Sequence, residues 1–247
     1  MIEIVNLHKK FGSKPVLQGI NLTIEDGETN VIIGKSGSGK SVLLKHIVGL
    51  LFPDEGYVKV GGEIIDNSNT KKLYQIRRKF GFLFQGAALF DSMTVGENIA
   101  LPIIENEYKL SQKELDNKIA KMLDLVDLPN TQNLKPAELS GGMKKRVGLA
   151  RALITEPEYI LYDEPTTGLD PLSTIHLKEL LKTATKNGKT ILITSHIMSF
   201  VEENADEIVF LMDGKIYFKG TIAELKTKTE QPDFEHAIAS ILSSSYA

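Results

Sequence analysis

Hydrophobic and polar residues alternate along the first 33 residues of the chain, and this is the pattern of short strands with one buried face. Turn residues at Gly12, Gly19 and Asp26-Gly27 interrupt the alternation, so we expect several short antiparallel strands in this region. Other apolar runs are short and uninterrupted, which favours buried strands of a central sheet. These runs cover residues 29–33, 80–84, 159–164 and 190–194.

Apolar residues at helical spacing predict helices between these strands. Ser111 and Glu114 have the spacing of a capping box, which predicts a helix that begins at this point. Thr221 and Glu224 repeat this pattern ahead of a short helix, and Asp213-Gly214 predicts a β-hairpin. The longer expected helices cover residues 41–51, 111–128, 144–154, 172–184 and 234–242.

Residues 86–102 are apolar but show no clear period. We expect an irregular segment here, and two interpretations stay open. It is either a loop that covers the core or a surface that receives an apolar element of another protein.

Composition and charge narrow the class of protein. The chain has 247 residues, of which 42% are hydrophobic and 25% charged, so it can form one large or two small globular domains. The net charge of −3 provides no overall basic field, which argues against a nucleic-acid partner. There are no cysteines, so disulfides and thiol catalysis are excluded. We expect neither a signal peptide nor a membrane-spanning segment. We therefore expect a cytoplasmic protein that reaches a membrane through a partner.

A glycine-rich motif follows the predicted strand at residues 29–33 and precedes a predicted helix. Its spacing fits G-x-x-x-x-G-K-[ST], in which glycines let backbone N–H groups point at phosphates and the helix N-terminus adds positive charge. The alternative is a glycine-rich turn that merely begins a helix, and the flanking elements make this the weaker interpretation. The motif consists of Gly34, Lys35, Ser36, Gly37, Ser38, Gly39, Lys40 and Ser41. We expect Lys40 to reach the β- and γ-phosphates of a nucleotide, and Ser41 to complete the ligands of Mg²⁺.

A second helix start with the chemistry of an anion site occurs at Ser140, Gly141 and Gly142. Its alternative is an ordinary serine N-cap followed by glycines. The helix lies in a segment inserted between the strands that end at Gln85 and Asp163, so we expect it on a separate lobe. A site that needs both helix starts is then most easily completed by two copies of the chain, arranged head to tail.

Several polar residues follow predicted strands, where α/β sheets place their chemistry. Asp163 is expected to hold Mg²⁺ through water, and Glu164 to orient a water molecule against the γ-phosphate. His196 follows the strand at residues 190–194, a position that favours a functional over a structural histidine. Asp170 has a structural interpretation as the N-cap of the following helix. Phe11 is either an aromatic ring that stacks on the base or a core contact.

In this order, the motifs resemble those of the nucleotide-binding subunits of ABC transporters over essentially the whole chain. The matching motifs are the Walker A loop at residues 34–41, the Q-loop at Gln85, the signature Leu-Ser-Gly-Gly-Met at 139–143, Walker B at 159–163 followed by Glu164, the D-loop at Leu169-Asp170 and the switch histidine at His196. The resemblance implies an α/β fold: a P-loop NTPase (RecA-like) core with an N-terminal antiparallel β-subdomain and an inserted α-helical subdomain. It implies one domain, with residues 1–85 and 156–225 as the core, 86–155 as the helical subdomain and 226–247 as a tail.

The resemblance also implies an ATPase that binds ATP and Mg²⁺ and acts as a homodimer. Gln85 would sense Mg²⁺ beside Ser41 and Asp163 and couple the site to the membrane subunit. Residues 140–142 would bind the γ-phosphate held by the partner copy, with Asp170 close to the same nucleotide. Glu164 and His196 would act on the γ-phosphate, and Phe11 falls at the position of the family's adenine-stacking aromatic.

Two stretches resemble the Mla-type phospholipid-transport ATPases in particular. They are Phe-Leu-Phe-Gln-Gly-Ala-Ala-Leu-Phe-Asp-Ser-Met-Thr-Val at residues 82–95, and a signature that ends in Met143 where glutamine is common, followed by Lys-Lys-Arg. Lys35 and Ile197 depart from the family pattern without removing a nucleotide-contacting group. The resemblance implies a role in outer-membrane lipid asymmetry, on the cytoplasmic side of the inner membrane. The implied partners are an MlaE-like permease, an MCE-domain lipid carrier and a small STAS-type regulatory subunit.

Two alternatives to lipid transport stay open. One is an ABC ATPase for another cargo, such as an amino acid, reached through a different permease. The other is a non-transport cassette of the iron–sulfur assembly type, because those subunits are also single cassettes.

Overall fold

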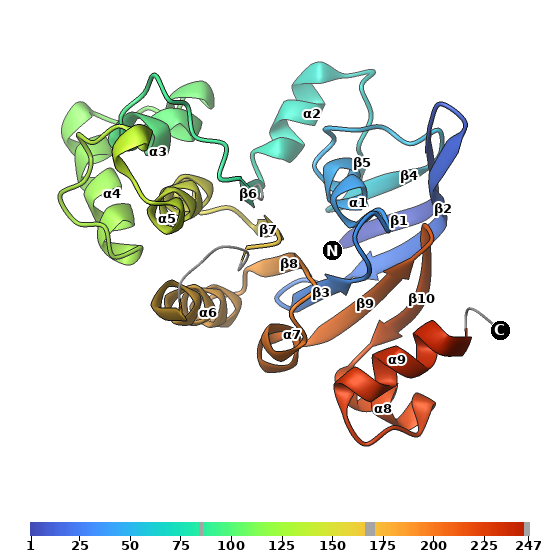
Figure 1. The fold of residues 1–247 in the computed structure, drawn as a ribbon. Coiled ribbons are helices and arrows are strands. Elements are labelled where there is room, and N and C mark those ends of the chain that lie inside the picture. The colour runs from blue at the N-terminus through green and yellow to red at the C-terminus, as the bar shows by residue number, and fades with distance from the viewer. Residues whose placement is uncertain (84–85, 166–170, 245–247) are drawn as a thin grey trace. The chain divides into compact units, whose positions relative to one another are not determined.

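The computed structural model describes residues 1–83, 86–165 and 171–244. The chain forms two compact units, which are coloured by residue number in Figure 1. The first unit contains Met1–Arg77 and the chain from Thr190 onward, and the second contains Arg78–Lys189. The subdomain boundaries expected near residues 86 and 156 stay a prediction.

An antiparallel sheet with the strand order β2-β1-β4-β5 forms one part of the first unit. Its strands are β1 (Ile2–Phe11), β2 (Lys14–Ile24), β4 (Glu55–Val60) and β5 (Glu63–Ile64). β1 and β2 form one long hairpin, so the turn predicted at Gly19 is wrong. Leu7 pairs with Ile20 and His8 with Gln18, which leaves Gly19 as the extra residue of a β-bulge with φ 75°. A bulge and a turn both favour glycine at a positive φ, so the sequence alone did not separate them.

Four further strands of the first unit lie side by side in the order β10-β9-β3-β8. These strands are β3 (Thr29–Ile33), β8 (Thr190–Ser195), β9 (Glu207–Met212) and β10 (Lys215–Gly220). β3 runs parallel to both β8 and β9, and every residue of β3 and β8 is buried. The predicted hairpin at Asp213-Gly214 is confirmed, because β9 and β10 pair antiparallel and both turn residues have positive φ.

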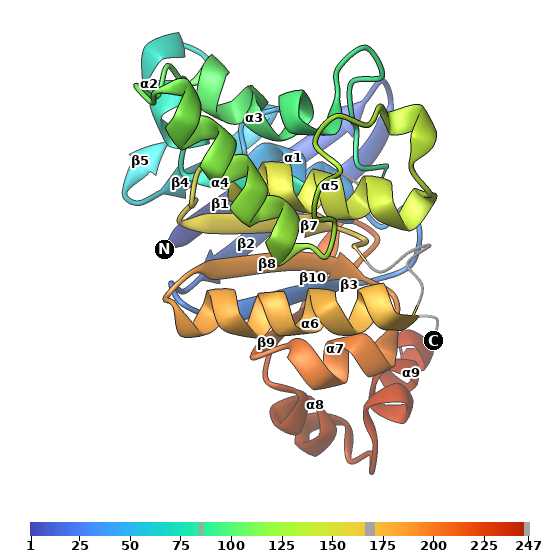
Figure 2. The ribbon, with the colours of Figure 1, turned by 90° about the vertical axis from the view of Figure 1, so that its left-hand side faces the viewer.

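Five helices of the first unit are described: α1 (Lys40–Ile47), α2 (Thr70–Arg77), α7 (Met198–Asn204), α8 (Ile222–Thr229) and α9 (Phe234–Ser244). The capping box predicted at Thr221 and Glu224 is confirmed at the start of α8. α8 and α9 lie against each other, and α7 contacts α9 (Figure 2). The sequence analysis did not predict α2 and α7, which are both short.

The second unit combines two parallel strands with several helices. Its elements are β6 (Phe80–Leu83), α3 (Val95–Glu105), α4 (Gln112–Leu125), the 3₁₀ helix η1 (Pro136–Glu138), α5 (Gly141–Leu153), β7 (Tyr159–Asp163) and α6 (Pro171–Lys186). α3, α4 and α5 pack on one another (Figure 2). The capping box predicted at Ser111 and Glu114 is present at the start of α4.

The prediction of an irregular segment at residues 86–102 is only partly correct, because α3 begins at Val95. Thr94 and Glu97 form a capping box that starts α3, and Pro102 lies inside the helix. The buried side chain of Asn98 accepts from the backbone N–H of Phe90 at 2.8 Å and donates to the Thr94 carbonyl at 2.9 Å. These side-chain bonds and the cap hold a helix whose proline would otherwise favour irregular structure.

Across the described ranges, none of the helices is long and apolar enough to cross a membrane.

Candidate functional site

The glycine-rich motif forms the turn between β3 and α1 in the first unit. A Cβ atom at Gly34 would lie 2.1 Å from the Leu211 carbonyl oxygen and 2.8 Å from Ser38 Oγ. Gly39, at the N-cap of α1, has φ 107°, and a Cβ there would lie 2.9 Å from Leu17 Cδ2. Side chains at these two positions would therefore displace the loop or the strands beside it.

The loop encloses a buried positive charge. The Lys40 ammonium donates to the carbonyl oxygens of Gly34 at 2.8 Å and Lys35 at 3.2 Å. The first turn of α1 contains no acidic residue, and its N-cap glycine provides no side-chain cap. Ser38 Oγ is buried without a hydrogen-bond partner among the described residues. A buried ammonium, an uncapped helix N-terminus and an unsatisfied hydroxyl together fit a polyanion such as a nucleotide triphosphate.

His196 is at the same edge of the parallel strands as this loop. Ser195, the last residue of β8, pairs in register with Ile33, the last residue of β3. The next residues along the two strands are therefore His196 and Gly34. His196 is exposed, so its imidazole can meet a ligand at the loop.

Phe11 ends β1 in the first unit with 48% of its surface exposed, so the alternative of a core contact is wrong. The β1–β2 hairpin also contacts the end of the phosphate loop, because a Cβ at Gly39 would lie 3.1 Å from the Val16 carbonyl oxygen. An exposed aromatic ring on this hairpin is suited to stack on a base.

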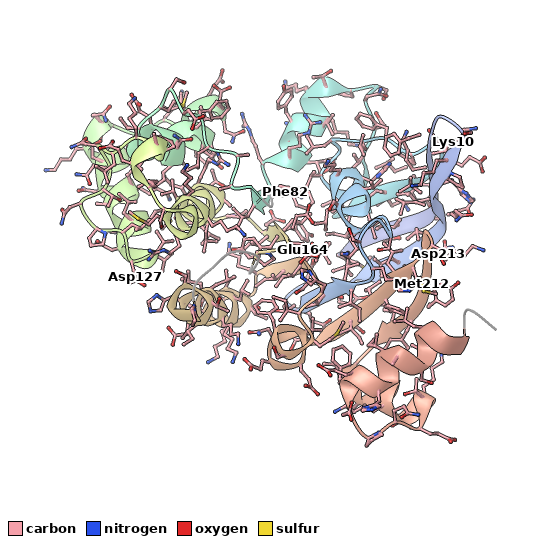
Figure 3. All side chains as sticks on the ribbon, in the orientation of Figure 1. Lys10, Phe82, Asp127, Glu164, Met212 and Asp213 are labelled. Carbon is pink, nitrogen blue, oxygen red and sulfur yellow. The ribbon has the colours of Figure 1, made fainter. Side chains whose placement is uncertain are left out.

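The two predicted carboxylates are at the end of β7 in the second unit, where Figure 3 labels Glu164. All of β7 is buried, and Asp163 and Glu164 are buried as well. Glu164 has φ 51°, a left-handed conformation that is uncommon for a residue with a side chain. Burial lowers the pKa of the Lys145 ammonium on α5, and the negative charge of Glu164 counteracts this lowering.

The second predicted helix start is confirmed as the N-terminus of α5. Ser140 is its N-cap, and Ser140 Oγ accepts from the Met143 backbone N–H at 3.2 Å. Ser140 and Gly141 are exposed, a Cβ at Gly141 would contact nothing within 4 Å, and the first turn contains no acidic residue. This 13-residue helix therefore presents an open N-terminus to an anion from outside the unit.

Gln85 and Asp170 lie outside the described residues. The first unit thus brings together the phosphate loop with Lys40 and Ser41, the exposed His196 and the hairpin with Phe11. The second unit contains the carboxylates and the helix start at Ser140. The Ser41 hydroxyl of the first unit and the Asp163 carboxylate of the second are each an oxygen donor of the kind that Mg²⁺ prefers, so each residue by itself fits this ion.

Arg151 is a positioning residue that the sequence analysis missed. Its guanidinium donates to the carbonyl oxygens of Ala88 at 2.7 Å and Ala87 at 2.5 Å. Ala87 and Ala88 have φ values of 60° and 48° and lie just after Gln85 in the sequence. Arg151 therefore fixes this strained segment to α5. No local sequence pattern indicates this contact, because the two alanines are more than 60 residues away from Arg151 along the chain.

The chain matches one family model and is similar to several known proteins. A family model described as ABC transporter matches residues 17–167. The Arabidopsis thaliana protein trigalactosyldiacylglycerol 3, chloroplastic, is 38% identical over 93% of this chain and 71% of its own length. A probable ribonucleotide transport ATP-binding protein, mkl, of Mycobacterium bovis is 40% identical over 93% of this chain and 64% of its own length.

A solved structure has the same fold. It is a dimeric ATP-binding cassette in a post-hydrolysis state with ADP and Pi, and it superposes with a TM-score of 0.84 at 34% identity. The match covers 90% of this chain and 98% of that one. The predicted fold class, a P-loop NTPase core with an antiparallel β-subdomain and a helical subdomain, is confirmed.

Proposed function

Because this chain belongs to the ABC transporter family and is an ATPase that binds ATP with Mg²⁺, we propose that it drives a membrane permease that moves phospholipid. It is a cassette of the kind that dimerises and works with a permease. The observation that supports a lipid cargo is the 38% identity, over 93% of the chain, to a protein named for a galactolipid. The signature that ends in Met143 and the stretch at residues 82–95 support the same assignment.

In this proposal the phosphate loop binds the triphosphate of ATP. Lys40 exchanges its bonds to the Gly34 and Lys35 carbonyls for phosphate oxygens, and the buried Ser38 hydroxyl gains a partner. Backbone N–H groups of the loop would bind the β- and γ-phosphates. Phe11 stacks on the adenine.

Hydrolysis requires a water molecule aligned with the γ-phosphate. The Glu164 carboxylate accepts a hydrogen bond from this water and orients it for attack, and His196 contacts the γ-phosphate. Ser41 and Asp163, with Gln85, would hold Mg²⁺, which would neutralise charge on the phosphate oxygens. Glu164 has a left-handed backbone conformation, with φ 51°, directly after the last residue of β7.

The exposed helix start at Ser140 is proposed to complete the site of a second copy of the chain. Its N–H groups, with Gly141 and Gly142, would bind the γ-phosphate held by the Lys40 of the other copy, with Asp170 nearby. ATP between two copies would hold the dimer closed, and loss of the γ-phosphate would release it.

The proposed permease contact lies on the second unit, at α3 and the segment before it. A groove of about 630 Å³ lies beside α3 and α4 and is lined by apolar residues such as Ala100, Leu115 and Ile119 and by polar ones such as Glu97 and Asp116. Phe90 and Ile104 are more than half exposed. An MlaE-like permease would insert an apolar element here, and an MCE-domain carrier and a STAS-type subunit would complete the complex at the inner membrane.

The experiment that tests this function is affinity purification of the tagged chain from solubilised membranes, with identification of bound proteins and lipids by mass spectrometry. We expect an integral-membrane permease, an MCE-domain protein and phospholipid in excess over a mock purification of the untagged chain, which reports non-specific binding. A periplasmic amino-acid-binding protein, or iron–sulfur assembly proteins without a permease, would instead support one of the two alternatives. The name of the mycobacterial relative adds a ribonucleotide to the cargoes to be tested.

A further inference from the structure

Lys9 places a cation beside the exposed ring of Phe11. Its Nζ lies 5.8 Å from the centroid of the Phe11 ring, within the range in which a cation is attracted to an aromatic face. The Lys9 side chain is only 16% exposed, whereas Phe11 is 48% exposed. The ring therefore has a partly buried cation on one side and surface open to solvent elsewhere.

Hydrogen bonds to the segment that follows α1 fix the position of this cation. The Lys9 ammonium donates to the Phe52 carbonyl oxygen at 2.9 Å and to the Asp54 carboxylate at 2.9 Å. The other Asp54 oxygen accepts from the Lys10 backbone N–H at 2.8 Å. The hydrogen bond from Lys9 lowers the pKa of Asp54, so the carboxylate is charged at neutral pH. The ammonium is thus held by a charged and a neutral acceptor at the same time.

These contacts join two parts of the first unit that the nucleotide site uses. α1 begins at Lys40, behind the phosphate loop, and the chain that leaves its C-terminus reaches Phe52 and Asp54. Lys9 links this segment to the end of β1, where Phe11 lies. Lys9 therefore contacts the Phe11 ring directly, whereas its link to α1 runs through the segment at Phe52 and Asp54.

We propose that Lys9 is a positioning residue for the base of the nucleotide. It holds the Phe11 ring in the orientation that stacks on a purine, and its charge draws electron density from the ring, so that an electron-rich purine stacks more strongly on it. The ligand recognised in this way is the purine of a nucleoside triphosphate. The inference rests on the proposed role of Phe11 in the nucleotide site.

The test compares Lys9→Met with Lys10→Met in the full chain. Methionine keeps most of the aliphatic stem and removes the charge. Lys10 is the exposed neighbour on the same strand, labelled in Figure 3, so its replacement is a matched control. Calorimetry measures the affinity for ATP and for inorganic tripolyphosphate, which has no base. We expect Lys9→Met to weaken ATP binding by about three- to fivefold. We also expect unchanged tripolyphosphate binding, partial recovery in Lys9→Arg and no effect of Lys10→Met.

A double-mutant cycle with Phe11→Leu shows whether Lys9 acts through the ring. We expect Lys9→Met to have no further effect on ATP affinity once Phe11 is leucine. An equal loss of tripolyphosphate affinity, or the same loss in the leucine background, would overturn the inference, because Lys9 would then act on the fold as a whole. If Phe11→Leu weakens ATP binding and Lys9→Met does not, only this inference fails. If Phe11→Leu itself leaves ATP affinity unchanged, the proposed base site fails.

Discussion

Replacing His46 by asparagine tests whether a buried neutral imidazole, on the helix behind the phosphate loop, makes the stability of the fold depend on pH. His46 lies on α1 with no exposed surface, and its Nδ1 is 2.7 Å from the Val42 carbonyl oxygen. Burial lowers the pKa of His46 below its ordinary value of 6.5, and the charge of Lys9 adds to this, although hydrogen bonds to the Val42 and Phe52 carbonyls oppose it. The imidazole is therefore neutral in the folded chain at neutral pH.

The sign of the pH effect follows from which state binds the proton. Below pH 6.5 the unfolded chain protonates His46 and the folded chain does not, so the stabilising contribution present above pH 6.5 is lost as the pH falls towards the lowered pKa. The free energy of unfolding should fall by at most about 1.4 kcal/mol between pH 6.5 and 5.5 through this residue alone. Asparagine keeps a donor for Val42 and does not titrate, so this part of the slope should disappear.

Urea unfolding measured at intervals from pH 7.5 to 5.0 provides the slope for each protein. Loss of packing in His46→Asn lowers its stability at every pH, so the comparison is between slopes and not between absolute values. Leu44→Ala, a buried and non-titrating position on the same helix, is the control for lost packing and should keep the slope of the parent chain. An identical slope in His46→Asn and the parent would refute the reasoning. A buried imidazole that stays neutral while the unfolded chain binds a proton must lower the free energy of unfolding as the pH falls through this range.

Three further predictions concern the site. Glu164→Gln should bind ATP normally and lower turnover by about a hundredfold or more, because the water-orienting carboxylate is lost; a steady-state ATPase assay showing near-normal turnover would exclude the role. Lys40→Ala should weaken ATP binding by at least about tenfold, and calorimetry showing unchanged affinity would contradict the phosphate-loop assignment. Arg151→Met should lower the free energy of unfolding by about 2–3 kcal/mol in urea because two carbonyls lose a charged donor, and a change below about 0.5 kcal/mol would show that the contact is dispensable.

The elements with local signals were predictable from the sequence. The capping boxes at Ser111 and Thr221 and the hairpin at Asp213-Gly214 depend on residues within four positions of one another, and all three are confirmed. α3 was missed although Thr94 and Glu97 carry the same signal, because Pro102 and the aperiodic apolar residues suggested an irregular segment. Gly19 was assigned to a turn because a bulge has the same conformational requirement.

The groups proposed to bind phosphate were predictable because the chemistry fixes their spacing. Lys40 and Ser140 lie at helix starts, where the motifs predicted them. The residues that fix neighbouring segments through long-range contacts were not predictable. Lys9 contacts Asp54 across 45 positions, and Arg151 contacts Ala88 across 63. Such pairs come together only after the chain has folded, so no local pattern in the sequence encodes them.

The central claim, that each ATP site is shared between two copies of the chain, is tested most directly by mixing two inactive variants. Lys40→Ala lacks the phosphate-loop ammonium, and Ser140→Arg blocks the open helix start. In a mixed dimer, one site combines the intact loop of one copy with the intact helix start of the other. A random mixture should therefore regain up to about a quarter of the parent's sites, and ATPase activity well above that of either variant alone. A mixture no more active than its separate components would contradict the shared site.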